Sequence, residues 1–136
     1  MTFVSVFTRF LKCNPMRALK IHETDETPAI TLDKENGLFE ISGRSLPEDS
    51  AEFYSPVLDW VSGYAKDPNP MTEFVFKLDY SNTASTKFIH EILIILEKIK
   101  GLKISWWYRE DDEDLEELGH ELSEQVTIPF DFKIYK

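Results

Sequence analysis

Residues 77–101 read KLDYSNTASTKFIHEILIILEKIKG, and this stretch decides the type of fold. It joins an apolar, β-rich segment (73–79) to a long helical pattern through a run of small polar residues. The apolar positions of the helical pattern share one face: Phe88, Ile89, Ile92, Leu93, Leu96 and Ile99. We therefore expect a buried strand and then a helix over 84–100 that packs Ile92 and Leu96 against a sheet and ends before Gly101.

The turn between these two segments carries Ser81, Asn82, Thr83, Ser85 and Thr86, where one or two such residues would suffice to cap a helix. Asn82 is the best N-cap candidate, which makes Thr83 the first helical residue. The free N–H groups and the positive end of the helix dipole favour an added phosphate at that place. Spacing alone nevertheless favours a plain structural role for Thr83, because Ser and Thr cap many helices.

Further elements follow on both sides of this unit. The segments 29–33 and 38–42 flank a four-residue turn with Gly37, which indicates a β-hairpin. Helical patterns occupy 47–66 and 113–122, and strands are expected at 103–108 and 126–135. In the first of these helices Asp49 and Glu52 have capping-box spacing, and Pro56 marks either a kink or a later start.

The resulting element order is β-β-α-β-α-β-α-β, which predicts a single α/β domain with a mixed β-sheet and packed helices. The strands at 73–79 and 103–108 should be adjacent and parallel, since a helix connects them. Pro129 pushes the last strand toward a sheet edge. Trp106 and Trp107 point to opposite faces, and packing in the core is favoured for both over a role of Trp107 at an interface.

Composition narrows the functional classes. The net charge of −10 argues against a nucleic-acid partner, because phosphate binding requires clustered Lys and Arg. Cys13 is the only cysteine, so no disulfide can form within the chain and no zinc site of several Cys ligands is available. These features predict a cytoplasmic protein.

Residues 1–15, MTFVSVFTRFLKCNP, are apolar and basic, with Phe3, Phe7 and Phe10 at helical spacing. The apolar part is too short to span a bilayer, and it lacks the features of a secretory signal. We interpret 1–15 as a loosely ordered extension, either disordered or not part of the mature domain, with Met16 as the real or alternative start, and 16–136 as the domain. An amphipathic membrane contact is the less favoured reading.

Catalytic chemistry has little support in the sequence. His22, His90 and His120 are scattered without ligand spacing, so neither a metal site nor a catalytic residue is predicted. The acidic run 110–114 lacks the glycine and alternating ligands of a calcium loop, and it suits the first turn of a helix. There is no Gly-rich phosphate loop and no nucleophile elbow, and no cofactor is expected.

An ordered set of residues from about 26 to 132 resembles the SiaC-type regulatory phosphoproteins of bacterial biofilm signalling. The matching positions are Thr27-Pro28-Ala29-Ile30, Gly37-Leu38, Gly43, Ser45, Pro47-Glu48, Ser50, Asp59-Trp60-Val61, Leu78, Asn82-Thr83, Ser85, Lys87, Trp106, Tyr108, Glu117-Leu118-Gly119 and Pro129-Phe130. No single piece is specific, whereas the ordered set is fairly specific. The family resembles, more distantly, the STAS domains of anti-sigma-factor antagonists.

The resemblance implies that Thr83 is the phosphorylated residue, with Asn82, Ser85 and Lys87 framing a partner-binding surface. It also implies a serine/threonine kinase of histidine-kinase-like fold, a PP2C-type phosphatase, and an effector that the unphosphorylated form binds and activates, such as a diguanylate cyclase. The chain would thus be a non-enzymatic component of cyclic-di-GMP signalling by partner switching, without a membrane partner.

Two other functional classes stay open at this point. The chain is alternatively a constitutive adaptor with a STAS-like fold, in which Thr83 is only part of a helix cap. It is, less favourably, a small enzyme that uses acidic side chains, although no acid–base pair is localised by the sequence. A phosphate on Thr83 distinguishes the switch from both.

Overall fold

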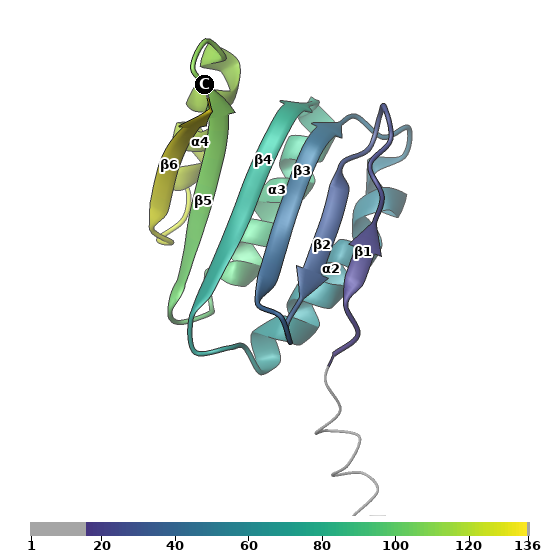
Figure 1. Cartoon of the computed structure of the whole chain (residues 1–136), viewed down its shortest axis with the longest axis vertical. Helices are drawn as coiled ribbons and strands as arrows, with labels where there is room; N and C mark the ends of the chain where they lie inside the picture. The colour runs from purple at the N-terminus through teal and green to yellow at the C-terminus, as the bar shows by residue number, and fades with distance from the viewer. Residues whose placement is uncertain (1–15, 136) are drawn as a thin grey trace, which may run out of the picture.

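The computed structural model describes residues 16–135, and it arranges them as one twisted sheet with helices behind it (Figure 1). The elements, in chain order, are β1 (Leu19–Ile21), β2 (Ala29–Asp33), β3 (Leu38–Ser45), α2 (Ser50–Lys66), β4 (Thr72–Ser81), α3 (Thr83–Leu96), β5 (Leu102–Arg109), α4 (Glu113–Glu124) and β6 (Phe130–Tyr135).

The six strands lie side by side in the order of the chain, β1 to β6. Strands β1, β2 and β3 are antiparallel neighbours, whereas β3, β4, β5 and β6 run parallel. Phe74 of β4 is paired with Ile104 of β5, so the predicted parallel neighbours are confirmed. The predicted mixed α/β sheet is confirmed as well, and β6 lies at an edge, as Pro129 suggested.

The sequence prediction missed one strand and misplaced several helix boundaries. Strand β1 has three residues, Leu19–Ile21, and so short a segment carries no readable alternation. Helix α3 ends at Leu96 rather than at residue 100, and a turn leads from there to Gly101. Helix α2 begins at Ser50 with Asp49 as its N-cap, and Pro56 lies inside it. The predicted capping of this helix by Asp49 is confirmed.

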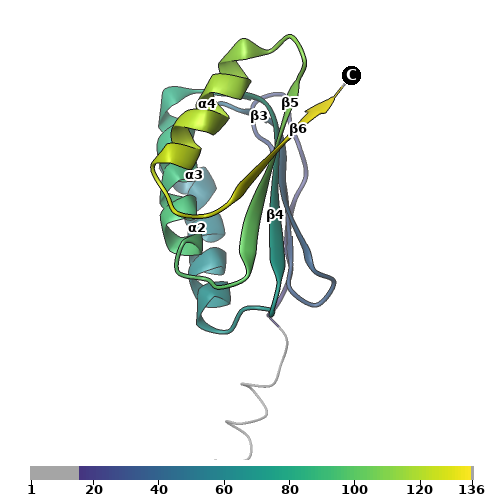
Figure 2. The same ribbon diagram turned by 90° about the vertical axis from the view of Figure 1, so that its left-hand side faces the viewer.

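All three helices of the described residues cover the same face of the sheet (Figure 2). The core lies in this single layer, where Ile92 and Leu96 of α3 are fully buried, as predicted. Trp106 is likewise buried, whereas Trp107, the next residue of the strand β5, points to the other face and is half-buried. No helix covers that face within residues 16–135 (Figure 2). The expectation that Trp107 is a core residue is therefore wrong. Lys77 and Lys133 lie over its ring instead, 5.2 and 5.6 Å from the centroid.

Helix α4 approaches the sheet closely because residue 119 has no side chain. A Cβ atom on Gly119 would lie 2.5 Å from Trp106 and 2.9 Å from Phe132, closer than carbon atoms can approach. The indole N–H of Trp106 donates a hydrogen bond of 2.9 Å to the carbonyl of Leu115. These contacts hold the start of α4 beside the end of β4.

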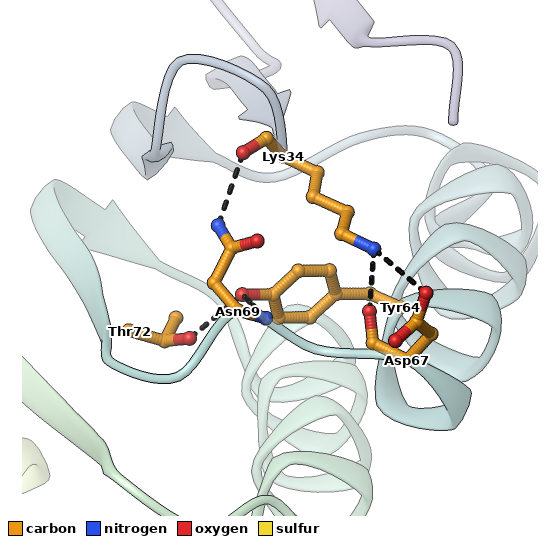
Figure 3. Close-up of polar contacts among 5 residues, drawn as sticks. All are labelled: Lys34, Tyr64, Asp67, Asn69 and Thr72. Carbon is orange, nitrogen blue, oxygen red and sulfur yellow. Dashed lines mark hydrogen bonds and ion pairs between the residues drawn. The ribbon is translucent and has the colours of Figure 1, made fainter. Parts of the chain in front are cut away.

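A polar network joins the elements at the end of the sheet where β4 begins (Figure 3). We call it the lysine clip, and it comprises Lys34, Tyr64, Asp67, Asn69 and Thr72. Lys34 Nζ donates to the carbonyl oxygen and to Oδ2 of Asp67, over 2.6 and 3.2 Å. Asn69 donates from Nδ2 to the carbonyl of Lys34 and from its backbone N–H to the Tyr64 hydroxyl, each over 3.0 Å.

Candidate functional site

The site begins at the N-terminus of α3, at the opposite end of the sheet from the lysine clip (Figure 1). Asn82 is the N-cap, as predicted, and its Oδ1 accepts a hydrogen bond of 2.8 Å from the backbone N–H of Ser85. The backbone N–H of Asn82 donates to the carbonyl of Ser45 at the end of β3, over 3.0 Å. The first turn of α3 is thereby tied to the neighbouring parallel strand.

Three buried hydroxyl groups lie under this turn. We call Ser45, Tyr54 and Ser85 the hydroxyl cluster. Ser45 Oγ donates to Ser85 Oγ over 2.8 Å, and it lies 2.6 Å from the Tyr54 hydroxyl oxygen. Each of the three side chains is 0% exposed. Burial raises the pKa of Tyr54 to about 12, so its hydroxyl stays protonated at neutral pH and is available as a donor. The cluster ties β3, α2 and α3 together.

The next residues of α3 lie on the surface. Thr83, Ala84 and Lys87 are exposed, and Asn82 is half-buried. The structure places Ser85 beneath them, so this side chain supports the backbone of the first turn from below. Of the four residues predicted to form the site, three therefore reach the surface at the start of α3, and the fourth holds them in place.

Thr83 also lines a hollow of about 460 Å³ between the start of α3 and the start of α4. The wall contributed by the strand and by α4 is acidic, with Asp79, Asp112 and Asp114. Asp112 is the N-cap of α4, and its Oδ1 accepts from the backbone N–H of Leu115 over 3.0 Å. Arg109 lies 3.3 Å from Asp79 and balances one of these charges.

The exposed side chains of this site can accept a group on a hydroxyl and can present a surface to a partner. Within residues 16–135 no cluster of three or more His, Cys, Asp or Glu side chains is placed to hold a metal ion. Thr83 has an exposed hydroxyl at a helix start, and free backbone N–H groups of the first turn lie next to it. This arrangement suits a phosphate on Thr83.

Sequence reasoning missed the side chains that surround the predicted residues. Ser45 and Tyr54 come from distant segments, and they reach the start of α3 only through the parallel pairing of β3 with β4 and the packing of α2. Asp112 was recognised as part of a helix start, but its place across from Thr83 depends on the packing of α4. The one available signal was that parallel strands end at the same edge of a sheet.

The similarity of the chain to known proteins identifies its family. The profile described as SiaC family regulatory phosphoprotein matches residues 21–135 of the chain. The chain belongs to the SiaC family. An uncharacterized protein of Pseudomonas aeruginosa strain UCBPP-PA14 is 34% identical over 119 residues, which cover 85% of this chain and 94% of that protein. The predicted family resemblance is thus confirmed.

Solved structures agree with this family assignment. SiaC of Pseudomonas aeruginosa is 32% identical and superposes with a TM-score of 0.80, covering 88% of this chain and 100% of that one. A second SiaC structure, the activator in complex with the diguanylate cyclase SiaD of the same organism, is 33% identical with a TM-score of 0.78. It covers 86% of this chain and 99% of that one. The family is thus one of regulatory phosphoproteins, and the SiaC of that complex is the activator of its diguanylate cyclase.

One property of the helices bears on membrane contact. None of those formed by residues 16–135 combines the length and the apolar composition that crossing a bilayer requires.

Proposed function

We propose that the chain is a phosphorylation switch in which Thr83 is the phosphorylated residue. The unphosphorylated form binds and activates an effector enzyme, and the phosphate on Thr83 releases it. The observation that carries the proposal is an exposed threonine hydroxyl at the first position of a well-capped helix, in a family of regulatory phosphoproteins.

The surroundings of Thr83 explain how a phosphate would act. A phosphorylated threonine carries about −1.5 to −2 charges at neutral pH. Asp79, Asp112 and Asp114 line the same hollow and would repel this charge, so the phosphate is directed outward, toward a bound partner. A partner packed against the start of α3 would then meet a new dianion, and its affinity would fall without a large change in the fold.

The binding surface in this proposal is the first turn of α3. Lys87 is exposed there and offers a positive charge, while Asn82 and the buried Ser85 fix the backbone that the partner contacts. Small side chains at Thr83 and Ala84 permit close approach of another backbone or helix.

The partners follow from the family. The related SiaC forms a complex with the diguanylate cyclase SiaD, and we propose a diguanylate cyclase as the effector here. A serine/threonine kinase of histidine-kinase-like fold adds the phosphate, and a PP2C-type phosphatase removes it. This partner switching takes place in the cytoplasm, where kinase and cyclase domains find their nucleotides. The distant likeness of the fold to STAS domains is part of the same proposal.

Variants of Thr83 test the proposal directly. Thr83→Ala should fold normally, since surface substitutions usually change stability by less than about 0.5 kcal/mol. It should accept no phosphate from the kinase and should keep the effector bound in the presence of kinase and ATP. Thr83→Asp should bind the effector more weakly, although one carboxylate imitates a phosphate poorly. Co-purification of candidate cyclases with each variant measures these effects.

Matched control variants distinguish an effect that is specific to the site from the effect of any surface substitution. Ser62→Ala removes an exposed hydroxyl from α2, and it should behave like the unmodified chain. Lys87→Glu should weaken effector binding, whereas Lys98→Glu makes the same charge change just beyond the other end of α3 and should not. A Thr83→Ala protein that still gains a phosphate and still releases the effector would refute the proposed site.

A further inference from the structure

A second surface feature adjoins the start of α3 on the side away from the acidic hollow. It is an open groove of about 1180 Å³ between the N-terminal parts of α2 and α3. Its apolar surface comes from Phe53 of α2, Ala84 and Phe88 of α3, and Ile21 at the end of β1. Pockets for small ligands have volumes of about 300–1,000 Å³, so a groove of this size and openness suits a peptide segment.

The charges around the groove have one sign. Glu26, Glu48, Asp49 and Glu52 lie along it, and among residues 16–135 no Lys or Arg lines it. An apolar surface with an acidic border favours an occupant that is itself apolar and basic.

Residues 1–15 of the same chain have this composition. The segment contains no Asp or Glu, and its charged residues are Arg9 and Lys12. Phe3, Phe7 and Phe10 follow the spacing i, i+4, i+7, which would place their three aromatic rings on one side of a helix. Short segments with this spacing bind apolar grooves as helices, and their anchors occupy these positions.

The attachment point of the segment lies within reach of the groove. Met16 contacts helix α2 at Gly63, where 3.4 Å separate the Met16 methyl carbon from the position of a Cβ. The chain then runs through β1 to Ile21 at the groove, a path of five residues or about 17 Å in extended form. About five residues of the segment, at about 3.3 Å each, are enough to run back from Met16 over this distance to the groove. The ten that remain include all three phenylalanines.

We propose that the N-terminal segment binds the groove of its own chain through residues 1–10, with Phe3, Phe7 and Phe10 on its apolar surface and with Arg9 toward its acidic border. The bound segment covers Asn82 and Ala84, next to Thr83. It therefore competes with any partner that approaches the start of α3. This last consequence rests on the proposed function, whereas the binding of the segment does not.

A spin label on the full chain tests the binding. Cys13→Ser removes the only cysteine, and Ser5→Cys places a nitroxide on the side of the segment away from the phenylalanines. The label should broaden the amide NMR signals of Ala51, Phe53 and Ala84 along the groove, and it should leave those of the lysine clip sharp.

Substitutions on both sides of the contact provide the controls. Replacing Phe3, Phe7 and Phe10 by Ser in the labelled chain should abolish the broadening. Glu48→Lys with Glu52→Lys should reduce it strongly, whereas the matched exposed pair Glu113→Lys and Glu117→Lys on α4 should not.

Three outcomes would overturn the proposal. The first is sharp groove signals in the labelled full chain. The second is broadening seen only when labelled protein is mixed with isotope-labelled, spin-free protein, which would mean that a second copy is the occupant. The third is broadening that requires anionic lipid vesicles, which would assign the segment to a membrane surface. The measurement uses neither kinase nor effector, so its failure would leave the proposed function of Thr83 untouched.

Discussion

Helix α2 carries two buried tyrosines near its two ends, and the networks around them have different consequences. The Tyr54 hydroxyl lies 2.6 Å from Ser45 Oγ in the hydroxyl cluster. The Tyr64 hydroxyl lies 2.7 Å from Thr72 Oγ1 in the lysine clip. In both places a tyrosine of α2 bonds to a Ser or Thr hydroxyl of a neighbouring strand, and both tyrosines are almost completely buried.

The difference lies in what surrounds each tyrosine. In the lysine clip, the polar groups of Lys34, Asp67 and Asn69 bond to one another and join the hairpin to the end of α2 (Figure 3). At the hydroxyl cluster, the network fixes Asn82 and Ser85, and Thr83 between them remains exposed. A buried polar network at a helix end thus stabilises the fold in both cases. Only the second one lies beneath an exposed hydroxyl group, that of Thr83.

The largest expected effect sets a baseline for this comparison. Leu96→Ala removes a fully buried side chain from the middle of the core and should lower stability by about 2–5 kcal/mol. Because Leu96 belongs to neither network, the rate of Thr83 phosphorylation per folded molecule should not change. Chemical denaturation and a phosphorylation time course measure the two quantities. An unchanged denaturation midpoint would show that the packing of α3 is misassigned.

The two tyrosines provide the central comparison. Tyr54→Phe and Tyr64→Phe each remove a hydrogen bond from buried polar partners, and each should cost roughly 1–3 kcal/mol. Only Tyr54→Phe should also slow phosphorylation of Thr83 under conditions where both variants are folded, because only this hydroxyl lies beneath the first turn of α3. Equal phosphorylation rates for the two variants would show that the hydroxyl cluster has no positioning role.

The helix caps give a smaller, matched test. Asn82→Ala removes the cap of α3 and Asp112→Ala removes that of α4, and each should destabilise by about 1 kcal/mol. Asn82→Ala should reduce phosphorylation of Thr83 and binding of the effector more than Asp112→Ala does. If the loss of either cap had the same functional effect, the site would not be centred on the start of α3.

The smallest expected effects concern the pH dependence of stability. They differ between the two polar networks at the ends of α2. Hydrogen bonds from Asn36 hold the pKa of Asp33, beside the lysine clip, below its ordinary value of 3.8. Its contribution to stability is therefore present above pH 3.8 and is lost as the pH falls through its lowered pKa. Burial raises the pKa of Tyr54 from 10 to about 12, so its contribution is present below pH 10 and is lost as the pH rises through 12.

Denaturation midpoints across pH test this assignment. Asp33→Asn should flatten the acid side of the stability curve, and Tyr54→Phe should flatten the alkaline side. If Tyr54→Phe lost as much stability at alkaline pH as the unmodified chain, a group other than Tyr54 would cause the loss.

These comparisons also show how far the sequence could be read. The strong periodicities predicted both the parallel pair β4 and β5 and the buried stripe of α3, and the polar turn predicted Asn82 as the cap. Strand β1 was missed because three residues carry no pattern, and the single helical layer that leaves Trp107 uncovered depends on how successive helices cross the sheet. The site was predicted only in its local part, since Ser45, Tyr54 and Asp112 reach it through tertiary packing.

The most direct test of the account compares the unmodified chain with a preparation phosphorylated by its kinase. Mass spectrometry of peptides locates the phosphate, and a titration with the diguanylate cyclase measures the affinity of each form. We expect one phosphate, on Thr83, and a clear loss of affinity for the cyclase in the phosphorylated form. A phosphate on another residue, or equal affinity of the two forms, would contradict it.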